Sequence, residues 1–154
     1  MDGTELSFTA HPVRELIATA NFAYAHAYIN EADAPLGAAK GERLPGSPRI
    51  SAGVNADYTL PVTTLQPTIG TTVRYIGDRY ASFDQSTSYP QYYLPEYTSV
   101  DLRAGLTLGS TKLQLYIHNL FDERGQLGLL FPQFGARVAI MQPRTIGIAA
   151  TTRF

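Results

Sequence analysis

Three histidines and a few carboxylates are the side chains of this sequence that could do acid–base or metal chemistry. His11, His26 and His118 lie far apart, and none has the HxH or HxxxH spacing that brings two imidazoles to one metal ion. An acid–base pair would need two converging carboxylates, such as Asp57 and Asp101. Both carboxylates belong to extended segments that also carry arginines, which favours ion pairs over catalysis. We therefore expect no metal site and no catalytic residue.

The charged and amide side chains of the extended segments fit a ladder of polar contacts on one face of a sheet. Opposite charges on neighbouring strands stabilise each other when they share a face. Our interpretation is that this polar face lines a confined aqueous lumen. The residues predicted to face the lumen are Arg49, Asn55, Asp57, Arg74, Asp101, Arg103 and His118.

Other signatures of catalysis and binding are missing from the sequence. The chain has no cysteine, which excludes thiolate catalysis, disulfides and cysteine-based zinc sites. It has no GxSxG motif, and Gly125 and Gly128 do not form a phosphate-binding loop. Lys+Arg number 12 and Asp+Glu 13, a net charge of −1 without the basic excess of a nucleic-acid-binding protein. We expect no enzyme, no cofactor and no nucleic-acid partner.

Aromatic residues concentrate in two stretches that also contain prolines. Rings among residues 80–97 surround Pro90 and Pro95, and two more flank Pro132. One interpretation is an aromatic girdle, because such rings gather at the water interfaces of membrane barrels. The other is a stacking surface on outward loops for a small extracellular ligand. The residues proposed for that surface are Tyr80, Phe83, Tyr89, Tyr92, Tyr93, Phe131 and Phe134.

Strict alternation of apolar and polar residues predicts the elements that carry these side chains. Apolar side chains fill every second position from Val100 to Leu108, and Asp101 and Arg103 stand between them. This period of two is typical of a β-strand with one dry face and one wet face. A hairpin signal follows at residues 109–110, after which the alternation resumes.

The same alternation recurs along the chain and predicts an all-β fold, an antiparallel up-and-down meander of about seven long strands. The expected strands are about 9–13 residues long, whereas globular strands average about 5–6 and bilayer-spanning strands need roughly 9–11. Short turns on one side and long loops on the other are typical of bacterial outer-membrane barrels. We therefore predict a partial transmembrane β-barrel. The strands are expected near residues 4–11, 16–29, 48–60, 65–78, 96–108, 111–120 and 143–154, with short turns at 11–15, 61–64 and 109–110.

Several segments, in order along the chain, resemble TonB-dependent outer-membrane receptors. Within the NLFDER segment, Asn119 and Asp122 are expected to cap the turn through hydrogen bonds from side chain to backbone. The segments that carry the resemblance are GERLPGSP at 41–48, RYIGDRY at 74–80, YTSVDLR at 97–103, NLFDER at 119–124, PRTIG at 143–147 and the terminal RF at 153–154.

The resemblance implies that residues 1–154 are the C-terminal segment of such a receptor's barrel, without the plug domain and the N-terminal strands. Receptors of this type have about 22 strands around a plugged lumen. The implied location is the outer membrane of a Gram-negative bacterium, where the wall contacts lipid. The implied function is energy-coupled uptake of a scarce extracellular ligand, namely a siderophore, haem, cobalamin or a saccharide. TonB would act only through the missing N-terminal parts, and the barrel-assembly machinery would read the terminal aromatic Phe154.

Two other functions stay open on the sequence. One is a small outer-membrane barrel with a structural or adhesive role. The other is a soluble, lipocalin-like ligand binder, which would turn the apolar row from Val100 to Leu108 into a protein interior. The polar rows contain Ser, Thr, Asn and Gly rather than many Lys and Glu, which suits a crowded lumen better than bulk water.

Overall fold

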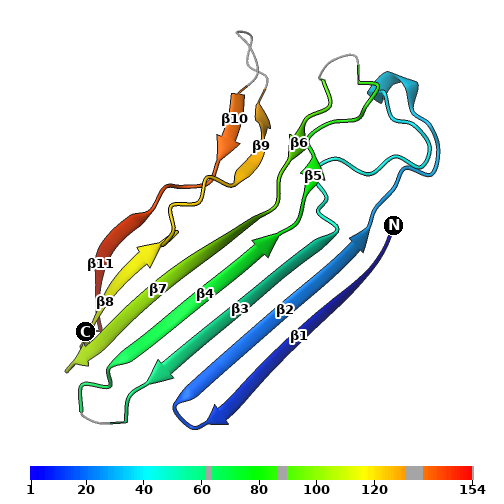
Figure 1. The fold of residues 1–154 in the computed structure, drawn as a ribbon. Helices are drawn as coiled ribbons and strands as arrows, with labels where there is room; N and C mark the ends of the chain where they lie inside the picture. Colours follow the sequence, from blue (N-terminus) through cyan, green and yellow to red (C-terminus); the bar gives the residue numbers. More distant parts are fainter. Residues whose placement is uncertain (62–63, 87–89, 131–136, 154) are drawn as a thin grey trace.

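The computed structural model describes residues 1–61, 64–86, 90–130 and 137–153, and its main element is one antiparallel sheet (Figure 1). Seven strands lie in the order β1-β2-β3-β4-β7-β8-β11. Neighbours in this order follow each other along the chain apart from two small inserted hairpins, so the predicted meander is confirmed. The strands are β1 (Asp2–Val13), β2 (Leu16–His26), β3 (Ile50–Thr59), β4 (Thr68–Ile76), β7 (Tyr97–Leu108), β8 (Thr111–His118) and β11 (Thr145–Thr152).

The two inserted hairpins lie in long connections where the sequence predicted no strand. Strands β5 (Arg79–Tyr80) and β6 (Tyr93–Leu94) form one of them, and β9 (Gln126–Leu130) and β10 (Arg137–Ile140) form the other. A 3-10 helix, η1 (Ala34–Leu36), is the single helical element within the described ranges. No helix in that part of the chain has the length and apolar character needed to cross a membrane.

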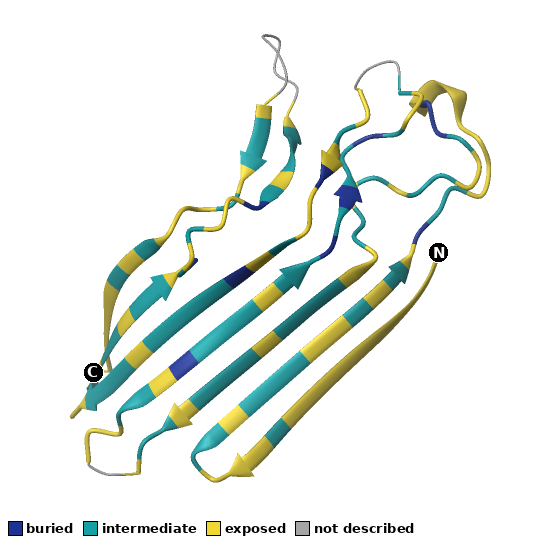
Figure 2. Cartoon of the chain, in the orientation of Figure 1, coloured by how far each residue is buried: buried dark blue, intermediate teal, exposed yellow. Residues whose placement is uncertain are grey.

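The sheet is a single layer whose apolar side chains do not pack into a protein core. The accessible surface is 10378 Å², against about 7,600 Å² for a compact monomer of this length. On the apolar face Leu6 is 62% exposed, Phe8 68% and Ile148 77%. Figure 2 shows in yellow that exposed residues occur along the strands of the sheet. A soluble protein of this size would cover such residues. The apolar row of β7 likewise lies on an open face, which argues against the lipocalin-like alternative.

The first short turn lies within the expected residues 11–15 but is shorter than expected, and the reason is local. Strand β1 continues to Val13, and the turn falls at Arg14 and Glu15. The pairing of β1 with β2 shifts register between Ala10 and Val13, around Pro12. Proline cannot donate to a sheet ladder, and it is tolerated in an edge strand or at a bulge. Here the bulge in an edge strand accommodates Pro12 without ending the strand.

The connections divide the molecule into two ends. The turns after β1, β3 and β7 lie at one end with the C-terminus, and the long connections lie at the other end with the N-terminus (Figure 1). We call the long connections outward loop 1 (residues 27–49), outward loop 2 (77–96) and outward loop 3 (119–144), and together the outward block. Within the described residues, β1 and β11 each have a neighbouring strand on one side alone, so the sheet does not close.

Candidate functional site

A bidentate ion pair on the polar face joins Arg103 of β7 to Asp57 of β3 across the strand between them. The Arg103 Nε donates to Asp57 Oδ1 at 2.8 Å, and Nη2 donates to Asp57 Oδ2 at 2.6 Å. Gly70 of β4 stands opposite both residues in the register. A Cβ at Gly70 would collide with the Asp57 carboxylate and the Arg103 guanidinium. Gly70 therefore leaves the space in which this bidentate ion pair forms.

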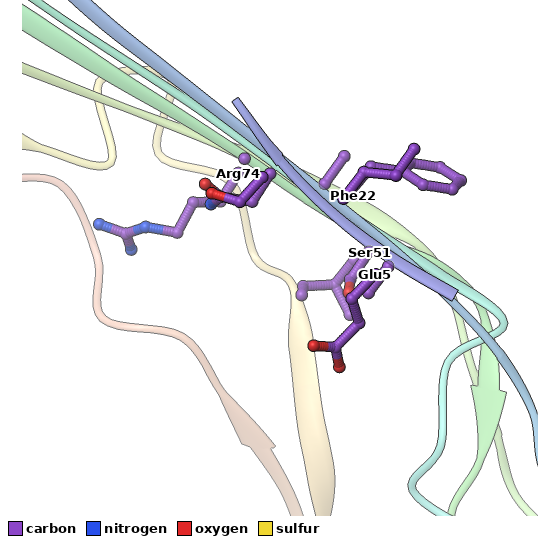
Figure 3. Close-up of a pocket in the computed structure, with 11 residues that line it drawn as sticks. Glu5, Phe22, Ser51 and Arg74 are labelled. Atoms are coloured by element: carbon purple, nitrogen blue, oxygen red, sulfur yellow. The ribbon is translucent and has the colours of Figure 1, made fainter. Parts of the chain in front are cut away.

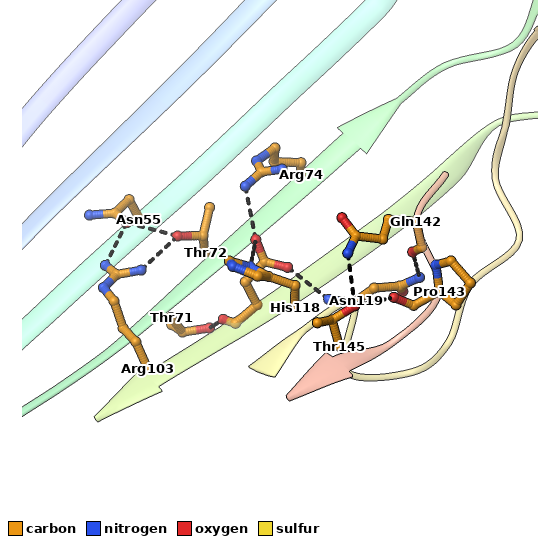
Figure 4. A network of polar contacts seen from close by, with 11 residues as sticks. Asn55, Thr71, Thr72, Arg74, Arg103, His118, Asn119, Gln142, Pro143 and Thr145 are labelled. Carbon is orange, nitrogen blue, oxygen red and sulfur yellow. Dashed lines mark hydrogen bonds and ion pairs between the residues drawn. The ribbon is translucent and has the colours of Figure 1, made fainter. Parts of the chain in front are cut away.

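Arg103 also organises the amide and hydroxyl groups beside the ion pair. Its Nη2 donates to Asn55 Oδ1 at 2.7 Å and its Nη1 to Thr72 Oγ1 at 2.9 Å (Figure 4). The Thr72 hydroxyl in turn donates to Asn55 Oδ1 at 2.9 Å, and Asn55 Nδ2 donates to Asp57 Oδ2 at 3.0 Å. Thr72 was not among the predicted residues, although it stands opposite Asn55 in the β3–β4 register. The prediction was limited to charged, imidazole and amide side chains, so it left out a threonine.

A second cluster gathers around Asp101 on β7, the strand that also carries Arg103. Arg74 Nη2 lies 2.9 Å from Asp101 Oδ2, and His118 Nδ1 lies 3.4 Å from the same oxygen. The other oxygen, Oδ1, accepts from the backbone N–H of Asn119 at 2.9 Å. The Asp101 side chain is 15% exposed, whereas Arg74 is 58% and His118 54% exposed. The carboxylate therefore lies behind two basic groups that face open space.

Six of the seven residues predicted for the polar face thus fall into two adjacent clusters, and Arg49 does not. Arg49 precedes β3, and its Nη2 donates to the hydroxyl of Tyr28 in outward loop 1 at 2.6 Å. It belongs to the end of the sheet that carries the long loops. Whether these residues contact a ligand or a further part of the protein stays a prediction.

Two hollows on the polar face meet at Arg74. One, of about 540 Å³, includes Glu5, Ser51 and Arg74 in its lining, and Figure 3 shows these three side chains on one side of the sheet with Phe22 on the other. The second, of about 470 Å³, includes Arg74 and His118 and reaches Met141 of outward loop 3. Both hollows are open, and each combines charged or polar side chains with apolar ones in its lining.

Two of the described aromatic residues of outward loop 2, Tyr80 and Tyr93, are in ring contact. The rings of Tyr80 and Tyr93 meet edge to face with centroids 5.7 Å apart, and Tyr93 is 51% exposed. The backbone carbonyl of Tyr92 accepts from Ala81 at 2.8 Å, and Phe83 is half-buried in the same loop. The remaining aromatic residues proposed for ligand contact, and the terminal aromatic, lie outside the described residues: Tyr89, Phe131, Phe134 and Phe154.

Outward loops 1 and 2 are joined by polar contacts that the sequence did not predict. Arg43 Nη1 pairs with Asp78 Oδ2 at 2.9 Å, and its Nη2 donates to the Asp78 backbone carbonyl. The carboxylate of Glu42 accepts from the backbone N–H of Ala39 at 2.9 Å and from that of Asp84 at 2.6 Å. These partners are separated by up to 42 positions along the chain, so no local pattern connects them.

Arg79 joins outward loop 2 to outward loop 3. This arginine is 5% exposed, and its Nη2 donates to the backbone carbonyls of Gln126 at 2.8 Å and Leu127 at 3.2 Å. The guanidinium carbon also lies 5.8 Å from the centre of the Tyr97 ring. A Cβ at Gly125 would collide with that ring, so glycine lets outward loop 3 pass closely over Tyr97. Side-chain hydrogen bonds and an ion pair therefore connect the three outward loops to one another.

The predicted capping of the turn after β8 is confirmed. Asn119 has a positive φ of 52° and is 3% exposed. Its Nδ2 donates to the carbonyls of Glu123 and Gln142, each at 2.9 Å, and its Oδ1 accepts from the Glu123 N–H at 2.9 Å. Asn119 thus joins the end of β8 to both ends of outward loop 3, as Figure 4 shows for Gln142.

Asp122 provides the second cap of this turn. Its Oδ1 accepts from the backbone N–H of Arg144 at 2.9 Å, and Oδ2 pairs with Arg124 at 2.8 Å. The Arg144 N–H, followed by the Arg124 guanidinium, lowers the pKa of the Asp122 carboxyl below its ordinary value. The deprotonated form of Asp122 therefore stabilises the point where outward loop 3 returns to the sheet.

Among the residues that the structure describes, no group of three or more His, Asp or Glu side chains is arranged to hold a metal ion. The arrangement instead offers a polar wall with two ion-pair clusters, an opposite face of exposed apolar side chains, and a connected block of loops at one end.

Comparisons with known proteins agree with this geometry. A family described as "TonB dependent receptor-like, beta-barrel" matches residues 1–120. A search of curated protein sequences finds no match. Among solved structures, the ferric yersiniabactin uptake receptor FyuA of Yersinia pestis matches with a TM-score of 0.79 and 20% identity, over 96% of this chain and 22% of its own.

Two further solved structures share the fold. The ferric-catecholate import receptor Fiu of E. coli K12, in its closed form, matches with a TM-score of 0.77 and 22% identity, over 99% of this chain and 20% of its own. The siderophore receptor PiuA of Acinetobacter baumannii matches with a TM-score of 0.76 and 19% identity, over 97% of this chain and 21% of its own. The chain thus spans about a fifth of the length of each structure.

Proposed function

The chain belongs to the TonB-dependent receptor family of β-barrels, and on this premise we propose that it forms part of the wall of an outer-membrane transporter for energy-coupled uptake of a scarce extracellular ligand. The observation that carries the proposal is the single-layer sheet, with an exposed apolar face and a polar face that carries partly exposed ion pairs. A sheet of this kind is stable where lipid covers one face and a wet interior the other.

For the ligand, we propose a ferric siderophore. The support is that structures with the same fold are described as receptors for ferric yersiniabactin, ferric catecholates and siderophores. Haem, cobalamin and a saccharide are the competing classes. The proposed contact surface consists of aromatic residues of the outward loops. Of these, Tyr80 and Tyr93 are in ring contact. Phe83 and Tyr92 lie in the same loop, and Tyr89, Phe131 and Phe134 complete the proposed set.

The rest of the transporter is proposed to come from other parts of a longer parent protein. The chain covers about a fifth of each matched structure, which supports a C-terminal barrel segment that joins further strands and a plug. TonB would contact the plug-bearing part and not this segment. The barrel-assembly machinery would recognise Phe154. On this proposal, residues 1–154 expressed alone carry out no active transport.

Uptake of radiolabelled ferric siderophores by iron-starved cells tests this function. We expect the full-length parent to support uptake of at least one siderophore and a deletion strain to lose it. Replacing Tyr80 and Tyr93 with Ala is expected to raise the concentration for half-maximal uptake while surface abundance stays unchanged. Arg49→Lys serves as a control at the same end of the sheet. If the cells take up haem, cobalamin or a saccharide but no siderophore, the siderophore proposal is rejected and the proposal of a transporter is retained.

Two outcomes would reject the transporter itself. Recovery of the protein in the soluble fraction without detergent would support the lipocalin-like alternative. Insertion in the outer membrane without uptake of any of the four ligand classes would support a structural or adhesive barrel.

A further inference from the structure

The apolar face carries a hollow of about 270 Å³ between strands β2, β3, β4 and β7. Ala56 and Thr71 stand opposite each other in the β3–β4 register and form its floor. The Thr71 hydroxyl donates to the backbone carbonyl of Asp101 at 3.1 Å. That hydroxyl is therefore satisfied within the sheet and does not need a partner in the hollow. The floor is therefore apolar although one of its residues is a threonine.

Larger side chains form the rim of this hollow. Leu16, Tyr58 and Ile69 stand side by side in the registers of β2, β3 and β4 on the side of the short turns, and Leu102 bounds the hollow on β7. Ile69 is 56% exposed and Tyr58 36%. Apolar concave surfaces favour an apolar guest over water. A tyrosine on the lipid side near a strand end is also typical of the membrane interface.

A positive charge precedes the hollow in the chain at the short-turn end. Arg14 is exposed in the turn two positions before Leu16, which lines the hollow, and it makes no hydrogen bond or ion pair in the described part of the chain. The backbone carbonyl of the next residue, Glu15, accepts from Thr59 N–H at 2.8 Å, which fixes this turn against the end of β3. Charged side chains near the short turns, within the described ranges, are three basic and one acidic: Arg14, Lys112, Arg153 and Glu15.

We propose that this hollow holds one acyl chain of an anionic phospholipid whose phosphate group faces Arg14. The inference rests on the membrane placement proposed above. Short turns of bacterial barrels face the periplasm, so the lipid belongs to the periplasmic leaflet. Basic residues at a membrane surface attract anionic headgroups. The apolar hollow selects a hydrocarbon chain, and the adjacent arginine selects the charge of its headgroup.

A second hollow on the same face provides an internal contrast. It measures about 170 Å³ and is lined mostly by apolar side chains, among them Phe8 and Val54. Both residues lie in the middle of their strands, away from the turns and from Arg14. This second hollow is expected to contact lipid without preference for headgroup charge.

Native mass spectrometry of the full-length protein purified from outer membranes tests the proposal. The probes are phosphatidylglycerol and phosphatidylethanolamine with identical acyl chains. We expect about fivefold tighter binding of the first phosphatidylglycerol than of phosphatidylethanolamine, the effect of about 1 kcal/mol per basic residue. Arg14→Gln removes the preference, and Ala56→Leu, which fills the hollow, weakens binding of both lipids.

Matched variants act as controls. Arg153→Gln removes a charge at the same end, and Ala52→Leu fills the second hollow. Both are expected to keep the fivefold preference. Equal binding of the two lipids to the native protein, retention of the preference in Arg14→Gln, or unchanged binding in Ala56→Leu overturns the proposal for a membrane-inserted protein. Recovery of the protein without membrane lipid, in the soluble fraction, rejects the membrane placement and the lipid site together.

Discussion

The seven-stranded sheet, which we call the wall, and the outward block bury apolar surface in different ways. Buried hydrophobic residues of the described chain are Ala27, Ala38 and Leu94, and all three lie in the outward block. The seven long strands contribute none, because their apolar side chains face outward. The outward block is thus held by its own small core and by contacts between distant loops. The wall is held by backbone ladders and depends on its surroundings to cover its apolar face.

The largest test of this comparison is at Asn119, where the two regions meet. Asn119→Ala removes three side-chain hydrogen bonds, each worth about 1 kcal/mol, so outward loop 3 should lose about 3 kcal/mol of local stability. Hydrogen–deuterium exchange should rise in β9 and β10 and stay unchanged in β2 and β3. Asn119→Gly tolerates the positive φ but lacks the amide, so it should behave almost as badly. Protection of β9 in both variants would contradict the linkage.

A smaller effect is expected at Arg79, which joins outward loops 2 and 3. Arg79→Met keeps an unbranched stem but loses the bonds to the carbonyls of Gln126 and Leu127, at a cost of about 2 kcal/mol. Limited proteolysis should then cut residues 77–96 and 119–144 faster, while the sheet stays resistant. If the loops resisted protease as before, they would be independent of each other and the outward block would not be one body.

Within the wall, Arg103→Lys should cost about 1 kcal/mol, because lysine cannot make the bidentate contact with Asp57 and the pair is partly open to solvent. The unfolding midpoint in denaturant should fall, and exchange in the outward block should not change. The matched control is Arg49→Lys, whose native residue makes one exposed hydrogen bond to Tyr28. Equal effects of the two substitutions would show that the Arg103 network adds no stability.

The smallest effect concerns acid pH. Asp122 has a lowered pKa in the folded chain, so its stabilising contribution is present above the ordinary value of 3.8 and is lost as the pH falls through the lower folded value. Exchange of the Arg144 amide, corrected for its intrinsic rate, should therefore rise below about pH 4. Asp122→Asn should show that faster exchange at neutral pH and little further change in acid. A flat profile in the native chain would contradict this assignment.

The wall could be predicted from the sequence because its rule is local. Alternation with a period of two fixes which side chains share a face, and this placed Asn55, Asp57, Asp101 and Arg103 on the polar face before any coordinates. Strand ends were less accurate: β2 ends at His26 and not at residue 29, because outward loop 1 begins to fold on itself there. The alternation therefore predicts which side chains share a face of the sheet better than it predicts where a strand ends.

The outward block could not be predicted in the same way. The contact between Arg79 and Gln126 joins residues 47 positions apart, and the bond between Glu42 and Asp84 joins residues 42 apart. Neither residue pair follows a repeat in the sequence. Each contact depends on where the strands of the sheet end, because those ends set the positions of the loops. The hairpins β5–β6 and β9–β10 have the same origin, because two or five residues are too few to show alternation.

The seven strands of the sheet determine whether an odd or an even number of further strands is needed to close a barrel. Six successive antiparallel pairings lead from β1 to β11, so the two boundary strands run in the same direction. Their free edges cannot join each other in antiparallel pairing. A ring that includes this sheet and keeps antiparallel order must therefore insert an odd number of additional strands between those two edges, which makes the total even.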